Sequence, residues 1–134
     1  MSPQVSTVLL VGDARSIHTR RWAVGLAECG LRVHLATVHA PHLPYPSTVV
    51  VHPLAGSRSL GYLRSIRPLR RLVRDLRPDL INAHYAAGYG VATYVALGGT
   101  AYPWMLSVWG SDVYDFPIRS AAYRALVSRA MRAA

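Results

Sequence analysis

The apolar residues of this 134-residue chain form short runs and helical stripes that alternate along the sequence. Five runs rich in leucine and β-branched residues have the length of buried strands; they cover residues 5–12, 32–38, 48–54, 80–83 and 103–108. Apolar positions at helical spacing predict helices that begin at residue 19 and that lie within residues 60–77, 86–97 and 120–134. This alternation predicts an α/β fold, with a parallel sheet and right-handed crossovers.

Residues 60–77 have the clearest two-sided pattern. One side is apolar, and the other carries Arg64, Arg67, Arg70, Arg71, Arg74 and Arg77. Pro68 lacks an amide donor, so we expect a short helix, a break, and a second helix from about Pro68. The arginines form either a solvated helix surface or a surface that attracts anionic phospholipid.

The composition adds few constraints. The net charge is +9, with 15 arginines and no lysine. A GC-rich genome alone can produce this preference for arginine, so the positive charge is a weak indication of function. We expect no nucleic-acid binding, because the chain shows neither interleaved aromatic residues nor a recognition helix. The single Cys29 excludes an internal disulfide and a cysteine metal cluster, which fits a reducing compartment. With no signal peptide or transmembrane span in the sequence, we expect a cytoplasmic protein.

Three polar segments follow predicted strands at one edge of the sheet. They are residues 12–18 after the first strand, His84 and Tyr85 after the fourth, and residues 109–112 (Trp-Gly-Ser-Asp) after the fifth. Ligands of open α/β sheets bind outside the carboxyl ends of the strands, so this edge is the expected site. The alternative for residues 109–112 is a turn with Asp112 as a helix cap.

Three stretches in the same order and spacing carry a resemblance to a known family. They are SIHTRRW (16–22), RPDLINAHYAAGYG (77–90) and SVWGSDVYDFP (107–117). Together they closely resemble the N-terminal domain of family 4 glycosyltransferases, enzymes of the retaining GT-B type. The resemblance covers nearly the whole chain.

The resemblance implies two Rossmann-like domains that face a cleft, with the acceptor on the N-terminal domain and the nucleotide-sugar donor on the C-terminal one. Residues 1–134 would be the acceptor-side domain, incomplete at its C-terminus because no strand follows the last predicted helix. The donor domain is absent from these residues, so we expect no turnover by this chain alone. A separate polypeptide could supply the donor-binding half.

The resemblance also implies site roles. His84 is a candidate catalytic group near the acceptor hydroxyl, since imidazole titrates near neutrality; alternatively it makes a structural bond at a strand end. Asp112 could orient His84, bind sugar hydroxyls or cap a turn. Many family members carry His-Gly where this chain has Trp109-Gly110. Because indole exchanges no proton at neutral pH, we expect Trp109 to stack on a sugar.

The remaining substrate-binding candidates come from the same three segments and are Gly12, Arg15, His18, Tyr85, Gly110 and Ser111. Gly12 would permit close backbone approach to a phosphate, beside the main-chain amides of the following helix. The fingerprint G-x-G-x-x-G is absent here, which argues against NAD, and we expect neither a metal nor another cofactor. We expect structural or solvated roles for the other histidines (His34, His39, His42 and His52) and packing roles for Tyr89 and Tyr94.

The sequence thus predicts transfer of a sugar from a nucleotide-sugar to a glycan or lipid-linked acceptor, with retention, in polysaccharide or glycoconjugate synthesis. A location peripheral to the inner face of the membrane would suit lipid-linked acceptors and the basic segment 60–77. Two alternatives stay open. One is a Rossmann-like module that binds a glycan or a partner without chemistry, and the other is a basic peripheral-membrane protein.

Overall fold

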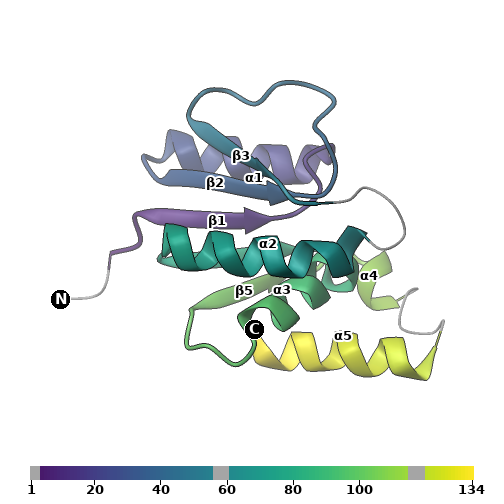
Figure 1. Cartoon of the computed structure of the whole chain (residues 1–134). Helices are drawn as coiled ribbons and strands as arrows, with labels where there is room; N and C mark the ends of the chain where they lie inside the picture. Colours follow the sequence, from purple (N-terminus) through teal and green to yellow (C-terminus); the bar gives the residue numbers. More distant parts are fainter. Residues whose placement is uncertain (1–3, 56–60, 115–119) are drawn as a thin grey trace.

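The computed structural model of the chain describes residues 4–55, 61–114 and 120–134 (Figure 1). Its sheet has five parallel strands in the order β3-β2-β1-β4-β5. The strands are β1 (Thr7–Val11), β2 (Arg32–Thr37), β3 (Val49–Pro53), β4 (Leu80–His84) and β5 (Trp104–Ser107). All five predicted strands are present, and the α/β, Rossmann-like fold is confirmed. The strand order reverses between β1 and β4, which places a crevice at their carboxyl ends.

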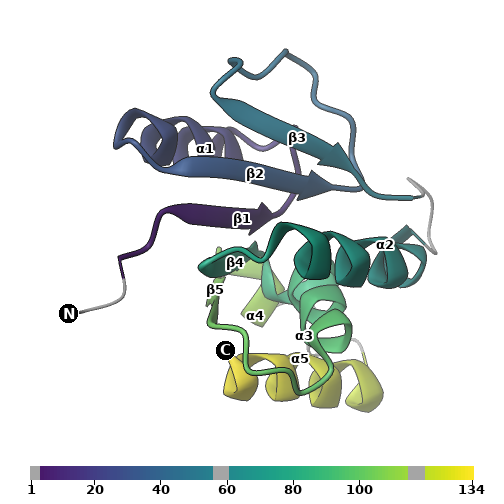
Figure 2. The same cartoon turned by 60° about the vertical axis from the view of Figure 1, so that its left-hand side comes forward.

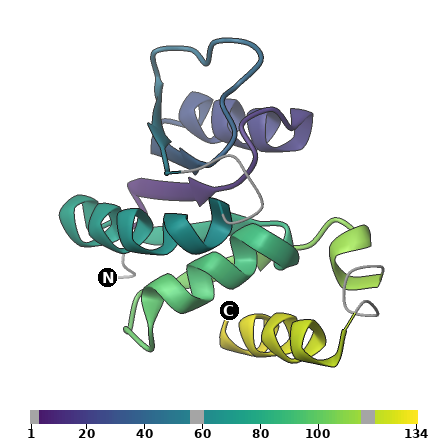
Figure 3. The same ribbon diagram turned by 45° about the vertical axis from the view of Figure 1, so that its right-hand side comes forward.

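The helices form a layer on each face of the sheet. They are α1 (Ile17–Glu28), α2 (Gly61–Leu76), the π-helical turn η1 (Ala86–Gly90), α3 (Val91–Leu97), α4 (Ser111–Tyr114) and α5 (Ala121–Ala133). Helix α1 covers one face, and α2 and α3 cover the other (Figures 2 and 3). Helix α5 packs against α3 and η1, and the indole nitrogen of Trp104 donates to the Ala133 carbonyl at 2.9 Å.

The central strand β1 supplies both halves of the core. Its five residues are all buried, because helices cover both faces of the sheet at this strand. The pleat points Val8 and Leu10 toward α1, and Leu9 and Val11 toward α2 and α3. This two-sided burial explains why the strand is a continuous apolar run and does not alternate.

Two predicted helix boundaries are wrong. Helix α1 begins at Ile17, two residues before the predicted start, because the Ser16 hydroxyl caps it by accepting from the His18 amide at 3.2 Å. Helix α2 continues through Pro68, where a break was expected. Leu69 and Val73 on its inner side are buried in the core. We attribute the continuity to this packing, which outweighs the missing amide donor of Pro68.

The predicted helix 86–97 is divided in the structure. Tyr85 has a φ of 82°, and both Ala87 and Gly88 depart from helical geometry, so a regular helix starts only at Val91. Gly88 has a φ of 63°, and a Cβ there would lie 2.7 Å from the Tyr62 ring. The turn therefore requires glycine, and it brings Tyr62 of α2 close to the end of β4. Within the described ranges, no helix is long and apolar enough to cross a membrane.

Candidate functional site

The structure brings the three polar segments together at the carboxyl ends of β1, β4 and β5. They surround a pocket of about 290 Å³, lined by Asp13, Arg15, Ser16, Thr19, His39, Tyr62, His84, Tyr85, Tyr89 and Trp109. Each predicted segment thus contributes to the lining, and the loop after β2 and the start of α2 add His39 and Tyr62. Among the described residues there is no group of three or more His, Cys, Asp or Glu side chains that could hold a metal ion.

His84, at the end of β4, is the most deeply buried titratable group of the pocket lining. Its side chain is buried, with 2% of the residue exposed. Nε2 lies 2.8 Å from Oδ1 of Asn82, and the buried Nδ1 has no hydrogen-bond partner among the described residues. Burial, aided by the nearby His18, lowers the pKa of His84 to about 4. The imidazole is therefore neutral at pH 7, and it is a weak base.

Aromatic rings surround His84. The ring of Trp22, on α1, meets it edge-on at a centroid distance of 6.2 Å, and Trp109 does so at 5.7 Å. Trp109 is 40% exposed and stacks on the His18 ring at 4.6 Å. The two predicted binding residues His18 and Trp109 thus form one aromatic pair at the rim of the pocket.

Asp112 is fully buried, and main-chain amides engage both of its oxygens. Oδ2 accepts from the Ala86 amide at 2.7 Å, and Oδ1 accepts from the amides of Trp109 and Gly110 at 3.0 and 2.9 Å. The structure therefore agrees with the turn-capping alternative for Asp112. It does not show the alternative in which Asp112 orients His84, because the bond of that imidazole goes to Asn82.

Arg15 and Asp13 form a two-point ion pair at the pocket edge. Arg15 Nε and Nη2 donate to the two oxygens of Asp13 at 3.0 and 2.8 Å. Burial raises the pKa of Asp13, but the bonds from Arg15 outweigh it, and the net pKa lies below its usual value. Arg15 was predicted to bind substrate, and in the structure its guanidinium is paired with Asp13 at the pocket edge.

Tyr89, His39 and Tyr62 form a second group of side chains in the pocket lining. The Tyr89 hydroxyl lies 2.7 Å from Nδ1 of His39 and accepts from the Val38 amide at 3.1 Å. Tyr62 meets the Tyr89 ring edge-on at 5.1 Å. Burial lowers the pKa of His39 and raises that of Tyr89. The structure assigns both residues to the pocket, whereas the sequence predicted a structural or solvated role for His39 and packing for Tyr89.

The remaining predicted residues lie around this pocket. Gly12 is buried against His84, so that a Cβ at Gly12 would lie 3.2 Å from the His84 Cβ. The His84 side chain therefore occupies the side of Gly12 that a Cβ would face, and a phosphate could not approach Gly12 from there. The hydroxyls of Tyr85 and Ser111 are 2.6 Å apart, and Gly110 has a φ of 112°.

Sequence reasoning missed Asn82 and Trp22. Asn82 precedes His84 by two residues in the same strand, and side chains two apart lie on the same face of a strand. That periodicity is a signal that could have found Asn82. No sequence signal distinguishes Trp22 from an ordinary apolar residue of α1.

Comparison with known proteins agrees with this architecture. A family model described as Glycosyl transferase 4-like matches residues 7–134. TuaC of Bacillus subtilis (strain 168), provisionally named as a teichuronic acid biosynthesis glycosyltransferase, is 38% identical over an alignment that covers 42% of this chain and 17% of TuaC.

Solved structures show the fold at low identity. A Listeria monocytogenes protein, provisionally named as a UDP-N-acetylglucosamine 2-epimerase, superposes with a TM-score of 0.62 at 11% identity, over 96% of this chain and 38% of that one. The C-terminal domain of the PF1911 hydrogenase from Pyrococcus furiosus gives a TM-score of 0.50 at 16% identity, over 79% of this chain and 95% of that one.

The chain spans less than two fifths of the length of TuaC and of the Listeria protein. The family model, in contrast, extends over nearly the whole chain and includes all three segments that form the pocket. This chain therefore belongs to the glycosyl transferase 4-like family.

Proposed function

We propose that these residues form the acceptor-side domain of a retaining glycosyltransferase. The complete enzyme would transfer a sugar from a nucleotide-sugar to a hydroxyl of a glycan or lipid-linked acceptor, in polysaccharide or glycoconjugate synthesis. The C–O bond between the sugar and the nucleotide breaks, and a new C–O bond forms to the acceptor oxygen, whose hydroxyl proton is released. Family membership and the place of the pocket in the sheet support this proposal.

One observation carries the proposal: a pocket that combines aromatic faces with a neutral hydrogen-bond acceptor. Sugars present apolar C–H faces and many hydroxyls, and aromatic rings with a few well-placed polar groups suit both. Trp109 and Tyr62 supply the faces, and His84 supplies the acceptor. Because the pKa of His84 is near 4, we assign to this imidazole the acceptance of a hydrogen bond from a hydroxyl, and not the removal of the hydroxyl proton.

The main-chain amides at the start of α1 and the Arg15 side chain lie at the same edge of the sheet. An anionic diphosphate is attracted by a helix N-terminus, so these groups would face the donor nucleotide held by a second domain. In this arrangement the donor-binding residues are supplied from outside residues 1–134, by the same or a separate polypeptide. The 134-residue chain by itself would then bind acceptor without turning over donor.

Calorimetry and a transfer assay with the purified chain test this division. We expect a Trp109→Ala substitution to abolish binding of acceptor oligosaccharides, and we expect no sugar release from labelled UDP-sugars in the absence of a donor domain. Val5→Ala is a control, because Val5 is exposed and precedes β1, whereas the pocket lies beyond the other end of that strand. A robust transfer rate from the 134-residue chain would contradict the proposed division of labour.

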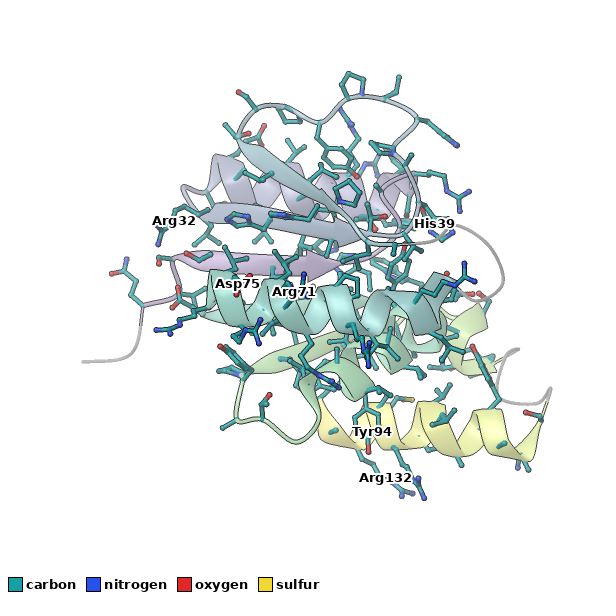
Figure 4. All side chains as sticks on the ribbon, viewed as in Figure 1. Arg32, His39, Arg71, Asp75, Tyr94 and Arg132 are labelled. Atoms are coloured by element: carbon teal, nitrogen blue, oxygen red, sulfur yellow. The ribbon has the colours of Figure 1, made fainter. Side chains whose placement is uncertain are left out.

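A second proposal concerns a peripheral membrane contact. The outer side of α2 carries exposed arginines, and α5 adds the exposed Arg129 and Arg132 to the same helical layer. Figure 4 shows Arg71 on α2 and Arg132 pointing away from the sheet on α5. Such a surface would attract an anionic leaflet, at about 1 kcal/mol per basic residue near it.

A further inference from the structure

The orientation of the Asn82 side chain follows from its neighbours. One end of the amide faces the Met105 carbonyl at 3.3 Å and the Ser107 hydroxyl at 3.0 Å. A main-chain carbonyl can only accept, so the Asn82 atom that faces it must be the donor nitrogen Nδ2. Oδ1, which can only accept, is then the atom that faces His84.

This orientation decides the tautomer of His84. Since Oδ1 of Asn82 has no hydrogen to give, Nε2 of His84 must carry the proton across their 2.8 Å separation. A neutral imidazole carries only one N–H, so Nδ1 is left as an acceptor with a free lone pair. Nδ1 is buried, and none of the described residues donates to it.

None of the neighbouring groups in the described part of the chain is bonded to this nitrogen. Trp22 and Trp109 approach the imidazole edge-on, and Gly12, which packs against the His84 Cβ, has no side chain to donate. Asp112 is bonded to three main-chain amides and has no hydrogen to donate as a carboxylate. A buried acceptor without a donor is unfavourable, and it is a reason to look for a ligand that completes it.

We propose that Asn82 is a positioning residue that holds His84 as the Nε2–H tautomer, so that Nδ1 accepts a hydrogen bond from a sugar hydroxyl in the pocket. This inference rests on the proposed function, and it adds that the sugar hydroxyl is the donor and His84 the acceptor of their hydrogen bond. The ligand atom at Nδ1 must carry a hydrogen, so the site selects a hydroxyl and rejects a carboxylate or an ether oxygen there. A deoxy sugar that lacks this hydroxyl would leave Nδ1 unpaired.

The aromatic rim must move for the ligand to reach Nδ1, because this nitrogen is buried. Trp109 is the group able to do so: it is 40% exposed, and its side chain can turn to another rotamer while Asp112 holds the main-chain amides of Trp109 and Gly110.

Nitrogen NMR of the full chain, labelled with ¹⁵N-histidine, tests the tautomer directly. We expect His84 to show a protonated Nε2 and an unprotonated Nδ1 between pH 6 and pH 8. Asn82→Ala should allow the other tautomer, and Asn82→Asp should raise the pKa of His84 by about one unit or more, because a carboxylate stabilises the imidazolium. Ser107→Ala is the matched control: it removes a partner of Nδ2 and leaves the bond to Nε2, so the tautomer should not change.

Titration with glucose and N-acetylglucosamine at millimolar concentrations tests the ligand bond. We expect the Nδ1 resonance of wild-type His84 to shift while the exposed His42 stays unchanged. A protonated Nδ1 in the empty chain would overturn the inference and leave the glycosyltransferase assignment standing. The correct tautomer with no shift of Nδ1 by either sugar would overturn the assignment of a hydroxyl to this nitrogen. Transfer by the complete enzyme is a separate measurement, so failure of the proposed function is distinguishable from both results.

Discussion

The carboxylate of Asp112 accepts a hydrogen bond from the Ala86 main-chain amide across 2.7 Å, and this bond joins the loops that follow β4 and β5. The other oxygen of Asp112 holds the amides of Trp109 and Gly110. One buried side chain thus fixes the spacing between the loop of His84 and the loop of Trp109. The aromatic rim of the pocket depends on this spacing.

Replacement of Asp112 should therefore be costly. Asp112→Ala leaves the buried amide of Ala86 and the part-buried amides of Trp109 and Gly110 without their acceptor. We expect the free energy of unfolding to fall by about 3 kcal/mol, since a buried unpaired group costs about 1–3 kcal/mol and the two part-buried amides cost less. Urea denaturation measures this change. Asp75→Ala is the control: Asp75 is an exposed carboxylate 3.6 Å from Arg74, and such pairs contribute about 0–1 kcal/mol. Equal losses in the two variants would contradict a structural role for Asp112.

Burial of His84 makes the stability of the domain depend on pH. The folded pKa of about 4 lies below the ordinary imidazole value of 6.5, so the unfolded chain binds more protons between these two values. The free energy of unfolding should rise with pH through this window, and at pH 4 it should lack about 3 kcal/mol of the contribution present at pH 7.

Chemical denaturation at pH 4.5 and pH 7 measures this dependence. His34 and His52 contribute in the same direction, since burial lowers their pKa values as well. The contribution of His84 is the difference between the wild-type chain and His84→Gln, which cannot gain a proton in this range. A pH dependence that is unchanged in His84→Gln would show that the imidazole is not held neutral by the fold.

Gly12 and Gly25 provide a matched pair of glycine substitutions. A Cβ at Gly12 would lie 3.2 Å from both the His84 Cβ and the Thr19 hydroxyl oxygen, whereas a Cβ at Gly25 in α1 meets nothing within 4 Å. We expect Gly12→Ala to destabilise the domain by about 1–3 kcal/mol through overpacking. Gly25→Ala should stabilise it by about 0.5–1 kcal/mol, since alanine favours a helix.

The melting temperature and the ¹⁵N resonances of His84 distinguish these outcomes. Gly12→Ala should lower the melting temperature and shift the His84 signals. Gly25→Ala should raise the melting temperature and leave the His84 signals unchanged. If Gly12→Ala left the melting temperature unchanged, the packing between the end of β1 and His84 would be looser than their contacts indicate.

The fold was largely predictable because each strand is a compact apolar run and each run is bounded by a turn residue. What the sequence pattern could not supply were effects set by tertiary contacts. Pro68 stays within α2, where its neighbours Leu69 and Val73 are buried in the core. The helix predicted after His84 is divided because the ring of Tyr62, 23 residues before Tyr85, occupies the space beside Gly88. Neither contact has a local signal.

The site was predictable to the level of segments and less so for individual residues. The rule that ligands bind at the carboxyl ends of strands led to three segments, and the structure brings these segments together around one pocket. The partner of His84 could not be chosen between Asp112 and Asn82 without geometry, because the choice depends on which way each side chain points. His39 and Tyr62 enter the pocket from the loop after β2 and from the start of α2, which sequence order alone does not place beside β4.

The basic face of α2 leads to a prediction about membranes. Arg67 and Arg71 are exposed on α2, and Arg70 instead donates to the carbonyls of Ala96 and Val95 at 3.0 and 3.2 Å. If the outer face of α2 meets an anionic leaflet, each of Arg67 and Arg71 contributes about 1 kcal/mol, which is about fivefold in affinity. The double substitution to glutamine should therefore weaken binding to phosphatidylglycerol vesicles by about 30-fold.

The matched control removes the same charge from elsewhere. Arg21 and Arg32 are exposed; Arg21 belongs to α1 on the opposite face of the sheet, and Arg32 begins β2. Their double substitution to glutamine should change vesicle binding far less, because interactions with the leaflet decay within about 8 Å at physiological salt. Co-sedimentation with phosphatidylglycerol and with phosphatidylcholine vesicles measures both variants. An equal loss in the two would mean that net charge alone drives binding, and it would remove the reason to place α2 against the membrane.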